Sequence, residues 1–279
     1  MGRLTTRRKV HTIDLDHDSA QRSRIDTLIV EEPMELRVDG TSLAVTMRTP
    51  GHDIELAHGF LLTEGVIGHR EQVLNARYCA GSVDGENTYN IIDVTATEEV
   101  TVPEGRNFYT TSSCGICGKA SIEAITTRLR FDPAADQTVW PAELIMQLPE
   151  LLRERQAAFD RTGGLHAAGL FTPDGRPLVV REDVGRHNAV DKVIGWAVLN
   201  DRLPLTGTAL VVSGRASFEL AQKAAMAGIS VLVAVSAPSS LAVEFADGVG
   251  LTIAGFTRGR RTNVYSRPDR IGTAVLSEA

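Results

Sequence analysis

Apolar positions follow two different periods in the first part of the chain. Between residues 26 and 49, apolar residues occupy alternate positions on both sides of Asp39-Gly40, a pair typical of tight hairpin turns. Residues 53–66 instead place apolar side chains three and four positions apart, which predicts a helix with Asp53 as its N-terminal cap. Further strands are predicted at 76–80, 89–94 and 99–102. Together these elements predict a small α+β domain.

The later part of the chain alternates short apolar runs with amphipathic stretches. The runs at 209–213 and 230–235 have the length of buried strands, and a stretch with helical spacing follows each. Parallel strands need a crossover connection, usually a helix, so this alternation predicts a mostly parallel sheet with helices on its faces. The predicted strands are 165–171, 178–181, 209–213, 230–235 and 251–254, and the predicted helices are 119–129, 141–159, 187–200, 217–227 and 239–247.

These patterns divide the chain into four parts. Residues 1–24 are polar and aperiodic, which predicts a flexible N-terminal arm. Residues 25–109 make up the α+β domain. Residues 110–118 are small, polar and flanked by glycine, so we expect a mobile loop. Residues 119–279 make up the larger α/β domain.

The predicted strands of the larger domain end in small, polar or basic residues. Segments 213–215, 236–240 and 255–258 follow three successive strands. Ligands of parallel sheets bind beyond the carboxyl ends of the strands, so we expect these segments to share one pocket. Arg258, Arg260 and Arg261 suit bidentate phosphate contacts, although a solvated surface turn is the alternative. Residues 213–215 and 239–240 lie at the starts of predicted helices, where free amides favour an anion; alternatively, Ser217 and Ser239 simply cap these helices.

Composition and charge narrow the class of protein. The chain has 279 residues, of which 43% are hydrophobic and 23% charged, as in ordinary globular proteins. Its net charge of -6 argues against a protein that coats nucleic acid. It shows no export signal and no apolar run near the roughly 20 residues that span a bilayer. We therefore expect a cytoplasmic protein that binds neither nucleic acid nor membrane.

The cysteines carry the most specific chemistry. There are three, Cys79, Cys114 and Cys117, which is too few and an odd number for a disulfide framework. The Cys114–Cys117 spacing suits a zinc site, dithiol exchange or carriage of sulfur as a persulfide. Zinc needs four ligands, and only Cys79 remains as a further thiol. That residue lies in a predicted strand, where a small core residue is expected. A mobile loop favours a carrier that visits two sites.

The motifs of this chain resemble those of the FdhD family, the formate dehydrogenase accessory sulfurtransferases. They are found at residues 113–118, 162–166, 181–192, 213–217, 237–242 and 255–258, in the family's order. The resemblance implies a protein that takes persulfide sulfur from a cysteine desulfurase. It further implies delivery to the molybdenum cofactor, Mo-bis(molybdopterin guanine dinucleotide), which formate dehydrogenase needs for activity.

The resemblance also implies a fold, an assembly and a set of site residues. The larger domain is expected to be cytidine-deaminase-like, with three layers, and the protein to be a homodimer. Zinc deaminases need His-x-Glu before a later Pro-Cys-x-x-Cys, whereas Ala167-Ala168 follows His166 here. We therefore expect no structural metal. The predicted catalytic residues are Cys114 and Cys117, and the sequence does not decide which carries the sulfur.

The predicted cofactor-binding residues lie at the strand ends. They are Ser213, Gly214, Arg215, His187, Phe256, Thr257, Arg258, Gly259, Arg260 and Arg261. His166, Asp183, Arg186 and Asp191 lie near them in sequence and belong either to the pocket or to a structural hydrogen-bond network. The expected ligands are the cofactor, as bound substrate, and a guanine nucleotide. The expected partners are a cysteine desulfurase, the catalytic subunit of formate dehydrogenase and a second copy of the chain.

Two other functions remain open at this point. A cofactor-binding chaperone with incidental cysteines would bind the same ligand without transferring sulfur. A zinc-dependent deaminase-like hydrolase would hold a metal through the cysteine pair.

Overall fold

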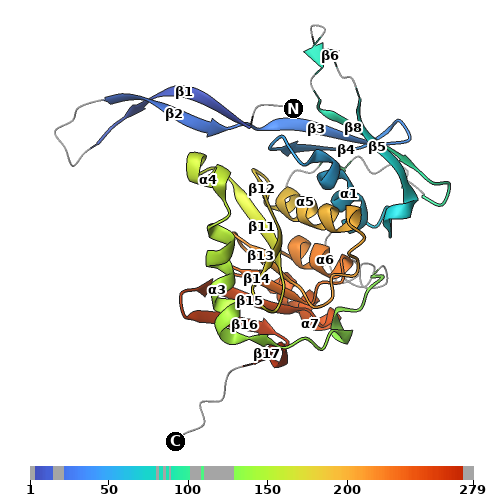
Figure 1. Cartoon of the computed structure of the whole chain (residues 1–279), viewed down its shortest axis with the longest axis vertical. Helices are drawn as coiled ribbons and strands as arrows, with labels where there is room; N and C mark the ends of the chain where they lie inside the picture. Colours follow the sequence, from blue (N-terminus) through green and yellow to red (C-terminus); the bar gives the residue numbers. More distant parts are fainter. Residues whose placement is uncertain are drawn as a thin grey trace, which may run out of the picture.

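The computed structural model describes residues 4–14, 22–79, 82–83, 86–87, 89–100, 108–109 and 129–272. Within these ranges the chain forms two α/β parts, a smaller N-terminal part and a larger one built on a six-stranded sheet (Figure 1). The mixed α/β class predicted from the sequence is confirmed. The domain boundaries drawn from the sequence stay a prediction.

The smaller part is a five-stranded sheet with one helix against it. Its strand order is β5 (Val73–Cys79), β8 (Ile91–Ala96), β3 (Glu32–Val38), β4 (Thr41–Arg48) and β9 (Phe108–Tyr109). The predicted hairpin is confirmed as β3 and β4, joined at Asp39 and Gly40, which both have positive φ. The helix is α1 (Asp53–Thr63), and a 3-10 turn at Arg70–Gln72 leads into β5. A separate ladder joins β6 (Ser82–Val83) and β7 (Glu86–Asn87).

Two details of this part differ from the sequence predictions. The N-cap of α1 is His52, and Asp53 lies in the first turn, where its carboxylate accepts from the Gly51 amide at 3.2 Å and pairs with Arg48 at 3.1 Å. Asp53 is therefore held by a buried arginine and does not cap the helix. Glu99 and Val100 lie in no strand, and the rest of that predicted strand falls outside the described residues.

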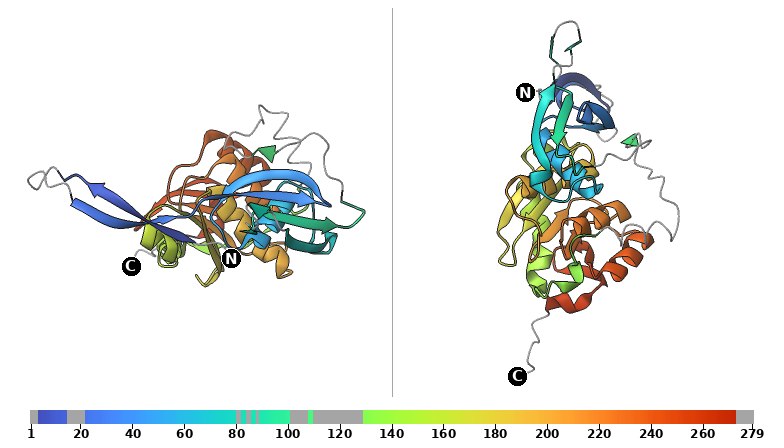
Figure 2. Two further views of the ribbon diagram at one scale, coloured as in Figure 1. Left: turned by 90° about the horizontal axis from the view of Figure 1, so that it is seen from above. Right: turned by 90° about the vertical axis from the view of Figure 1, so that its right-hand side faces the viewer.

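A two-stranded antiparallel ribbon extends from the smaller part. It consists of β1 (Thr5–Thr12) and β2 (Arg22–Ile29), and it projects away from the body (Figures 1 and 2). The arm that the sequence predicted over residues 1–24 contains β1, a strand that the sequence patterns did not indicate. The reason is that polar residues occupy both faces of the ribbon, as in the cross-strand pair Arg8 and Asp26, so no hydrophobic period marks the strands.

The larger part is a mixed sheet. Its order is β12 (Pro177–Asp183), β11 (His166–Phe171), β13 (Ala209–Val212), β14 (Val231–Ala234), β15 (Thr252–Arg258) and β16 (Arg261–Ser266). The strands β13, β14 and β15 are parallel, whereas the other three pairings are antiparallel, so the prediction of a mostly parallel sheet is wrong. The predicted strands of this part are confirmed, and β16 is an additional edge strand that the sequence patterns did not indicate.

Helices cover both faces of this sheet. On one face lie α5 (Arg186–Leu199), α6 (Phe218–Met226) and α7 (Ser240–Val249), and on the other lies α3 (Ala142–Arg153) (Figure 1). The core under α3 centres on Trp140, which is fully buried. The predicted helix 141–159 is instead two helices, α3 and α4 (Ala157–Thr162). The break is stabilised by the Glu182 carboxylate, which accepts from the amides of Ala158 at 2.9 Å and Phe159 at 2.7 Å at the start of α4.

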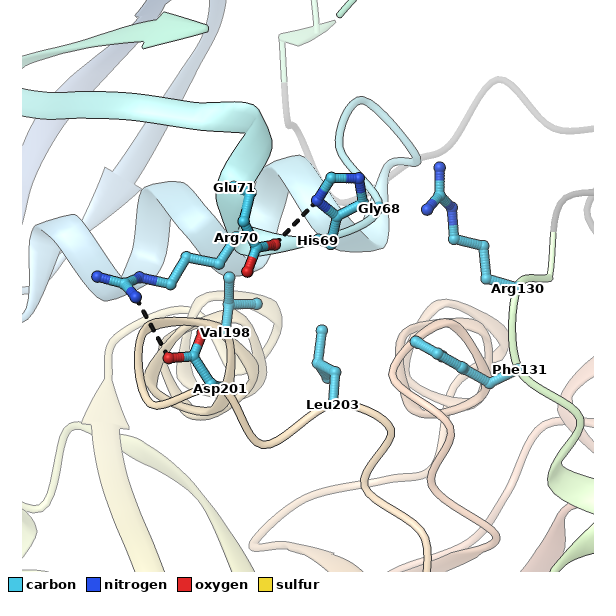
Figure 3. A pocket seen from close by; sticks show the side chains of 9 residues that line it. All are labelled: Gly68, His69, Arg70, Glu71, Arg130, Phe131, Val198, Asp201 and Leu203. Carbon is cyan, nitrogen blue, oxygen red and sulfur yellow. Dashed lines mark hydrogen bonds and ion pairs between the residues drawn. The ribbon is translucent and has the colours of Figure 1, made fainter. Parts of the chain in front are cut away.

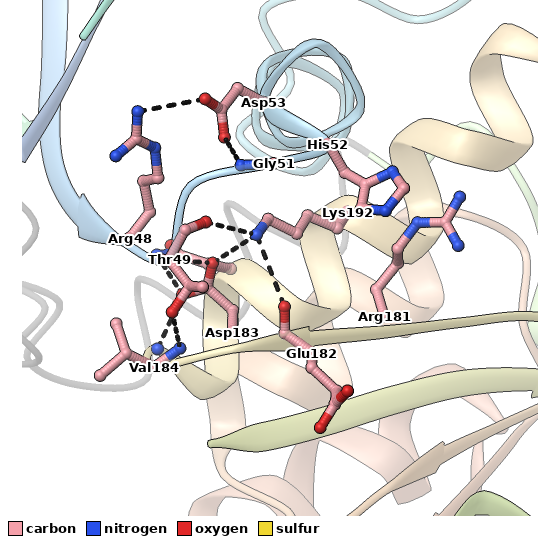
Figure 4. A network of polar contacts seen from close by, with 12 residues as sticks. Arg48, Thr49, Gly51, His52, Asp53, Arg181, Glu182, Asp183, Val184 and Lys192 are labelled. Carbon is pink, nitrogen blue, oxygen red and sulfur yellow. Dashed lines mark hydrogen bonds and ion pairs between the residues drawn. The ribbon is translucent and has the colours of Figure 1, made fainter. Parts of the chain in front are cut away.

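The two parts share one hydrophobic core because α1 packs directly on α5. Gly59 and Gly195 permit the approach: a methyl group at Gly59 would overlap the Asp191 carbonyl oxygen, and one at Gly195 would overlap that of Glu55. A polar network also joins the parts (Figure 4). In it the Lys192 ammonium pairs with Asp183 at 2.6 Å and donates to the Thr49 carbonyl at 2.9 Å.

The amino ends of the parallel strands are held by a buried arginine. Arg270 is 2% exposed and follows β16 in a 3-10 turn, Pro268–Arg270. Its guanidinium donates to the carbonyls of Pro133, Asp136, Ser230 and Gly250 and to the Thr252 hydroxyl. Nearby, β10 (Trp140–Pro141) pairs with β17 (Ile271–Gly272). None of the described helices is both long and apolar enough to span a membrane.

Candidate functional site

The carboxyl ends of β13, β14 and β15 continue as three segments that hydrogen-bond to one another. The Ser236 amide donates to the Gly214 carbonyl at 3.3 Å, and the Phe256 amide donates to the Ser236 carbonyl at 3.1 Å. Ala216 and Pro238 form a further bridge, in which the Ala216 amide donates to the Ala237 carbonyl. We call segments 213–217, 236–240 and 255–261 the rim. The structure therefore brings together the three segments that the sequence placed at one edge.

Ser213 and Gly214 connect the rim to the first strand of the sheet. The Ser213 hydroxyl accepts from the Ala167 amide at 2.9 Å, and the Ser213 amide donates to the Ala167 carbonyl at 3.0 Å. Gly214 faces His166 closely, since a methyl group on it would lie 3.6 Å from the imidazole Nδ1. Ser213 thus has a structural role, while the small Gly214 leaves the face of His166 uncovered.

Two helices begin beside the rim, and their first turns carry unsatisfied polar atoms. Arg186 Nε, His187 Nε2 and Ser217 Oγ are buried and have no hydrogen-bond partner among the residues that the structure describes. Ser217 is the N-cap of α6, yet its side chain makes no capping bond. Buried polar atoms normally find a partner, so unsatisfied ones at a helix start are expected where a ligand binds. No signal in the sequence distinguishes these three atoms from satisfied ones.

His187 is neutral at physiological pH. Burial lowers its pKa to about 4, and the neighbouring Lys223 and Arg186 cations act in the same direction. The Glu219 carboxylate lies 3.9 Å from Nε2 and opposes the shift. Burial likewise lowers the pKa of His166, with Arg186 contributing. A neutral imidazole in this position can donate or accept one hydrogen bond without adding charge.

The turn between β15 and β16 carries the predicted basic cluster. Arg258, Gly259, Arg260 and Arg261 are exposed, and none of the three guanidiniums forms an ion pair with a described residue. Phe256 is 44% exposed and has φ of 51°, a conformation that non-glycine residues rarely adopt. Arg215 is exposed on the neighbouring segment. Thr257 differs from the rest, because it is buried and its hydroxyl bonds to that of Thr262 at 2.8 Å.

Asp183 and Asp191 belong to buried networks away from the rim surface. Asp183 is fully buried, and its carboxylate accepts from the amides of Thr49 and Gly185 besides its pair with Lys192. Asp191 pairs with Lys223 at 2.9 Å and accepts from the Thr63 hydroxyl. Burial raises the pKa of Asp191 to about 6, against the effect of Lys223. These contacts favour the structural interpretation of both aspartates.

The predicted sulfur-carrying residues, Cys114 and Cys117, lie outside the described residues, as does the predicted helix at 119–129 apart from Leu129. Cys79 ends β5 and is half-buried, with its thiol free. In the described parts of the chain, no group of three or more histidine, cysteine or acidic residues could hold a metal ion.

A hollow of about 490 Å³ lies beside the rim at the start of α7. Ser239, Ser240 and Tyr265 line it together with Glu244 and Asp247. The two carboxylates disfavour phosphate there, so within the described residues the side of the rim that suits an anion is the one with Arg215 and Arg258–Arg261. Tyr265 comes from β16, the strand that the sequence patterns did not indicate.

Known proteins resemble this chain over nearly its whole length. The sequence profile of the FdhD/NarQ family matches residues 29–272. A sulfur carrier protein FdhD from Mycolicibacterium paratuberculosis is 59% identical over 273 residues, which cover 96% of this chain and 99% of that protein. One from Streptomyces coelicolor is 58% identical over 278 residues and covers 97% of both chains. A solved structure from Desulfotalea psychrophila, assigned as a formate dehydrogenase accessory protein, is 26% identical with a TM-score of 0.75 and covers 97% of this chain and 100% of that one. The chain therefore belongs to the FdhD/NarQ family.

Proposed function

We propose that this chain is a sulfur carrier that serves formate dehydrogenase. It accepts sulfur from a cysteine desulfurase as a persulfide on Cys114 or Cys117 and delivers it to Mo-bis(molybdopterin guanine dinucleotide). The observation that carries the proposal is the identity of 55–59% over nearly the full chain with proteins named sulfur carrier protein FdhD. Loading is an exchange of persulfide between thiols, in which the desulfurase persulfide gives up its outer sulfur and is left as a thiol.

The cofactor, as substrate, is proposed to bind at the rim. Its phosphates suit the exposed guanidiniums of Arg258, Arg260 and Arg261, and its guanine suits the exposed ring of Phe256. The unsatisfied donors Arg186 Nε and Ser217 Oγ provide hydrogen bonds for its oxygen atoms. Phe256 has a positive φ, and strained backbone positions of this kind recur at binding sites.

We also propose a fold for the larger domain and an assembly for the protein. The antiparallel pair β12–β11 followed by the parallel strands β13, β14 and β15 supports a cytidine-deaminase-like larger domain with three layers. We further propose a cytoplasmic homodimer that contacts a cysteine desulfurase and the catalytic subunit of formate dehydrogenase.

Persulfide loading is tested by mass spectrometry of the purified protein after incubation with a cysteine desulfurase and cysteine. The expected result is one additional sulfur atom on the peptide that contains Cys114 and Cys117. Cys114→Ala with Cys117→Ala should abolish loading and the activation of formate dehydrogenase. Cys79→Ala is the matched control and should retain both, because this half-buried thiol lies at the end of β5.

The same variants separate the alternatives. If the protein without Cys114 and Cys117 still activated formate dehydrogenase, sulfur carriage would be wrong and a cofactor-binding chaperone would remain. If the purified protein held one zinc ion per chain and lost it with the cysteine pair, a metal-dependent hydrolase would replace the carrier.

Cofactor binding at the rim is tested with GDP as the probe. Arg258→Ala with Arg261→Ala should weaken GDP binding by about tenfold or more, since two charge-assisted contacts are lost. Arg176→Ala is the control, because Arg176 is also exposed but lies in the β11–β12 turn. Unchanged affinity for GDP in the double variant would mean that these arginines are ordinary surface residues that do not bind the cofactor. Persulfide loading should be unaffected in every case.

A further inference from the structure

A second hollow, of about 520 Å³, is lined by other residues than those of the rim (Figure 3). It is bounded by the 3-10 turn before β5, by the residues that follow α5, and by Arg130 and Phe131. We call it the Arg130 pocket. Its volume falls within the range of small-molecule sites, roughly 300–1,000 Å³. No residue of the rim lines it, so the proposed sulfur transfer does not account for it.

Among the described residues, one of the two arginines that line the Arg130 pocket makes no ion pair. Arg70 pairs with Asp201 at 3.2 Å, and His69 pairs with Glu71 at 3.0 Å. Arg130 makes no hydrogen bond or ion pair with any described residue, and Figure 3 shows its guanidinium extended beside His69 and Gly68. Within the described residues, Arg130 is therefore the arginine of the pocket whose guanidinium is free to pair with a ligand.

Gly68 leaves the space that the Arg130 guanidinium occupies. A methyl group at Gly68 would overlap the guanidinium carbon and two of its nitrogens, so the flat group lies against the glycine backbone. The Gly68 amide is already engaged, since it donates to Gln72 Oε1 at 2.6 Å. The missing side chain at position 68 thus makes room for the cation and leaves its outer edge open.

The floor of the pocket is apolar and fixed. Val198 is buried, and Leu203 and Phe131 are partly buried. Phe131 packs closely against Gly228, since a methyl group at Gly228 would lie 3.1 Å from the Cβ of Phe131. An apolar floor beside a single free guanidinium suits an amphiphilic ligand with one charge at one end.

We propose that the Arg130 pocket binds a carboxylate carried on an apolar body. A carboxylate matches the bidentate fork of the Arg130 guanidinium, which makes no ion pair with a described residue. A phosphate monoester carries more charge, which the nearby carboxylates of Glu71 and Asp201 would oppose. The apolar body lies on Phe131, Val198 and Leu203. Such a ligand is either a free acid or the C-terminal residue of a protein partner.

The test uses the full chain, with hexanoate as the free acid and hexanamide as its uncharged equivalent. Binding is followed through the amide signals of the 15N-labelled protein. Hexanoate should bind with about millimolar affinity, as expected for so small a ligand, and at least tenfold more tightly than hexanamide. Equal binding of the two probes, or no binding of hexanoate, would overturn the proposal.

Two variants locate the site independently. Arg130→Met removes the charge and keeps the stem, while Gly68→Ala keeps the charge and displaces the guanidinium. Each should weaken hexanoate binding about tenfold. Arg202→Met is the matched control and should change it less than about twofold, because the Arg202 guanidinium lies over the Trp196 ring, 5.3 Å from its centroid. Full binding in both pocket variants would contradict the assignment.

A second arm identifies the source of the carboxylate. Acetyl-Gly-Leu with a free C-terminus is compared with the same dipeptide as its C-terminal amide. If the free dipeptide binds at least tenfold more tightly than hexanoate and its amide does not bind, the ligand is the C-terminus of a protein. Affinity equal to that of hexanoate assigns the pocket to a free acid. These measurements need no persulfide and no cofactor, so their outcome is independent of the proposed sulfur transfer.

Discussion

The two ends of the parallel strands in the larger sheet both contain buried polar groups, but they differ in how fully these groups are satisfied. Near the amino ends, Trp140 Nε1 is a buried atom without a hydrogen-bond partner among the described residues, whereas the charged groups there are paired. At the amino ends, Arg270 donates to four carbonyls and a hydroxyl, and the Asp136 carboxylate accepts from Ser230 and Gly207. At the carboxyl ends, Arg186, His187 and Ser217 each keep a buried atom that no described residue pairs with. The first arrangement stabilises the fold, and the second is expected where a ligand completes the hydrogen bonds.

The largest effect should come from the amino ends. Arg270→Met removes every donor of the guanidinium. The carbonyls of Asp136 and Gly250 lose that donor, and those of Pro133 and Ser230 keep only the amides of Asp136 and Thr252. We expect a loss of about 3–5 kcal/mol in the free energy of unfolding, measured by urea denaturation. A loss below about 1 kcal/mol would show that water replaces the guanidinium. In that case the contrast between the two ends would not hold.

A smaller effect should appear at the carboxyl ends as a dependence on pH. Burial lowers the pKa of His187 from 6.5 to about 4. Between these values the unfolded chain binds a proton that the folded chain does not, so stability is present above pH 6.5 and falls as the pH is lowered toward 4. Because the ring is partly exposed, we expect this residue to contribute a loss of about 2–3 kcal/mol rather than the full amount.

His187→Gln removes the titrating group and should flatten this part of the stability curve. Urea denaturation of both proteins at several pH values between 7 and 4 measures the difference. Parallel curves for the variant and the unmodified chain would mean that folding does not change the pKa of His187.

The smallest effect should come from a pair of matched serines. Ser217 and Ser239 are the N-caps of α6 and α7, but only the Ser239 hydroxyl accepts a capping bond, from the Ala242 amide at 3.2 Å. Ser239→Ala should cost about 1 kcal/mol of unfolding free energy, while Ser217→Ala should change it by less than about 0.5 kcal/mol. Thermal unfolding compares them directly. Equal losses would show that Ser217 is an ordinary cap.

The sequence predicted the elements whose hydrophobic pattern is strong. The all-apolar runs of β13 and β14 and the turn at Asp39-Gly40 are of this kind. It did not predict β1 or β16, because their polar residues on both faces leave no alternation to detect. The break between α3 and α4 depends on Glu182, a residue from a strand more than twenty positions away, which no local pattern contains.

For the candidate site, the sequence predicted which segments meet but not how each side chain is used. The three strand ends do form one rim, as the parallel order requires. Thr257 was predicted to bind the cofactor, but its hydroxyl is turned toward Thr262. The roles of Ser217 and Arg270 depend on which carbonyls and amides the fold places within reach. That is a tertiary property, and it is invisible in the order of residues.

The hydrogen bonds within the rim have a consequence for recognition. Since Gly214, Ser236 and Phe256 extend the ladder of the sheet, the rim is already ordered before any ligand arrives. Its conformational entropy is lost when the protein folds and not when it binds. Amide exchange at Ser236 and Phe256 should therefore be as slow as in the strands, and a rigid ligand should find the surface without waiting for a loop to close.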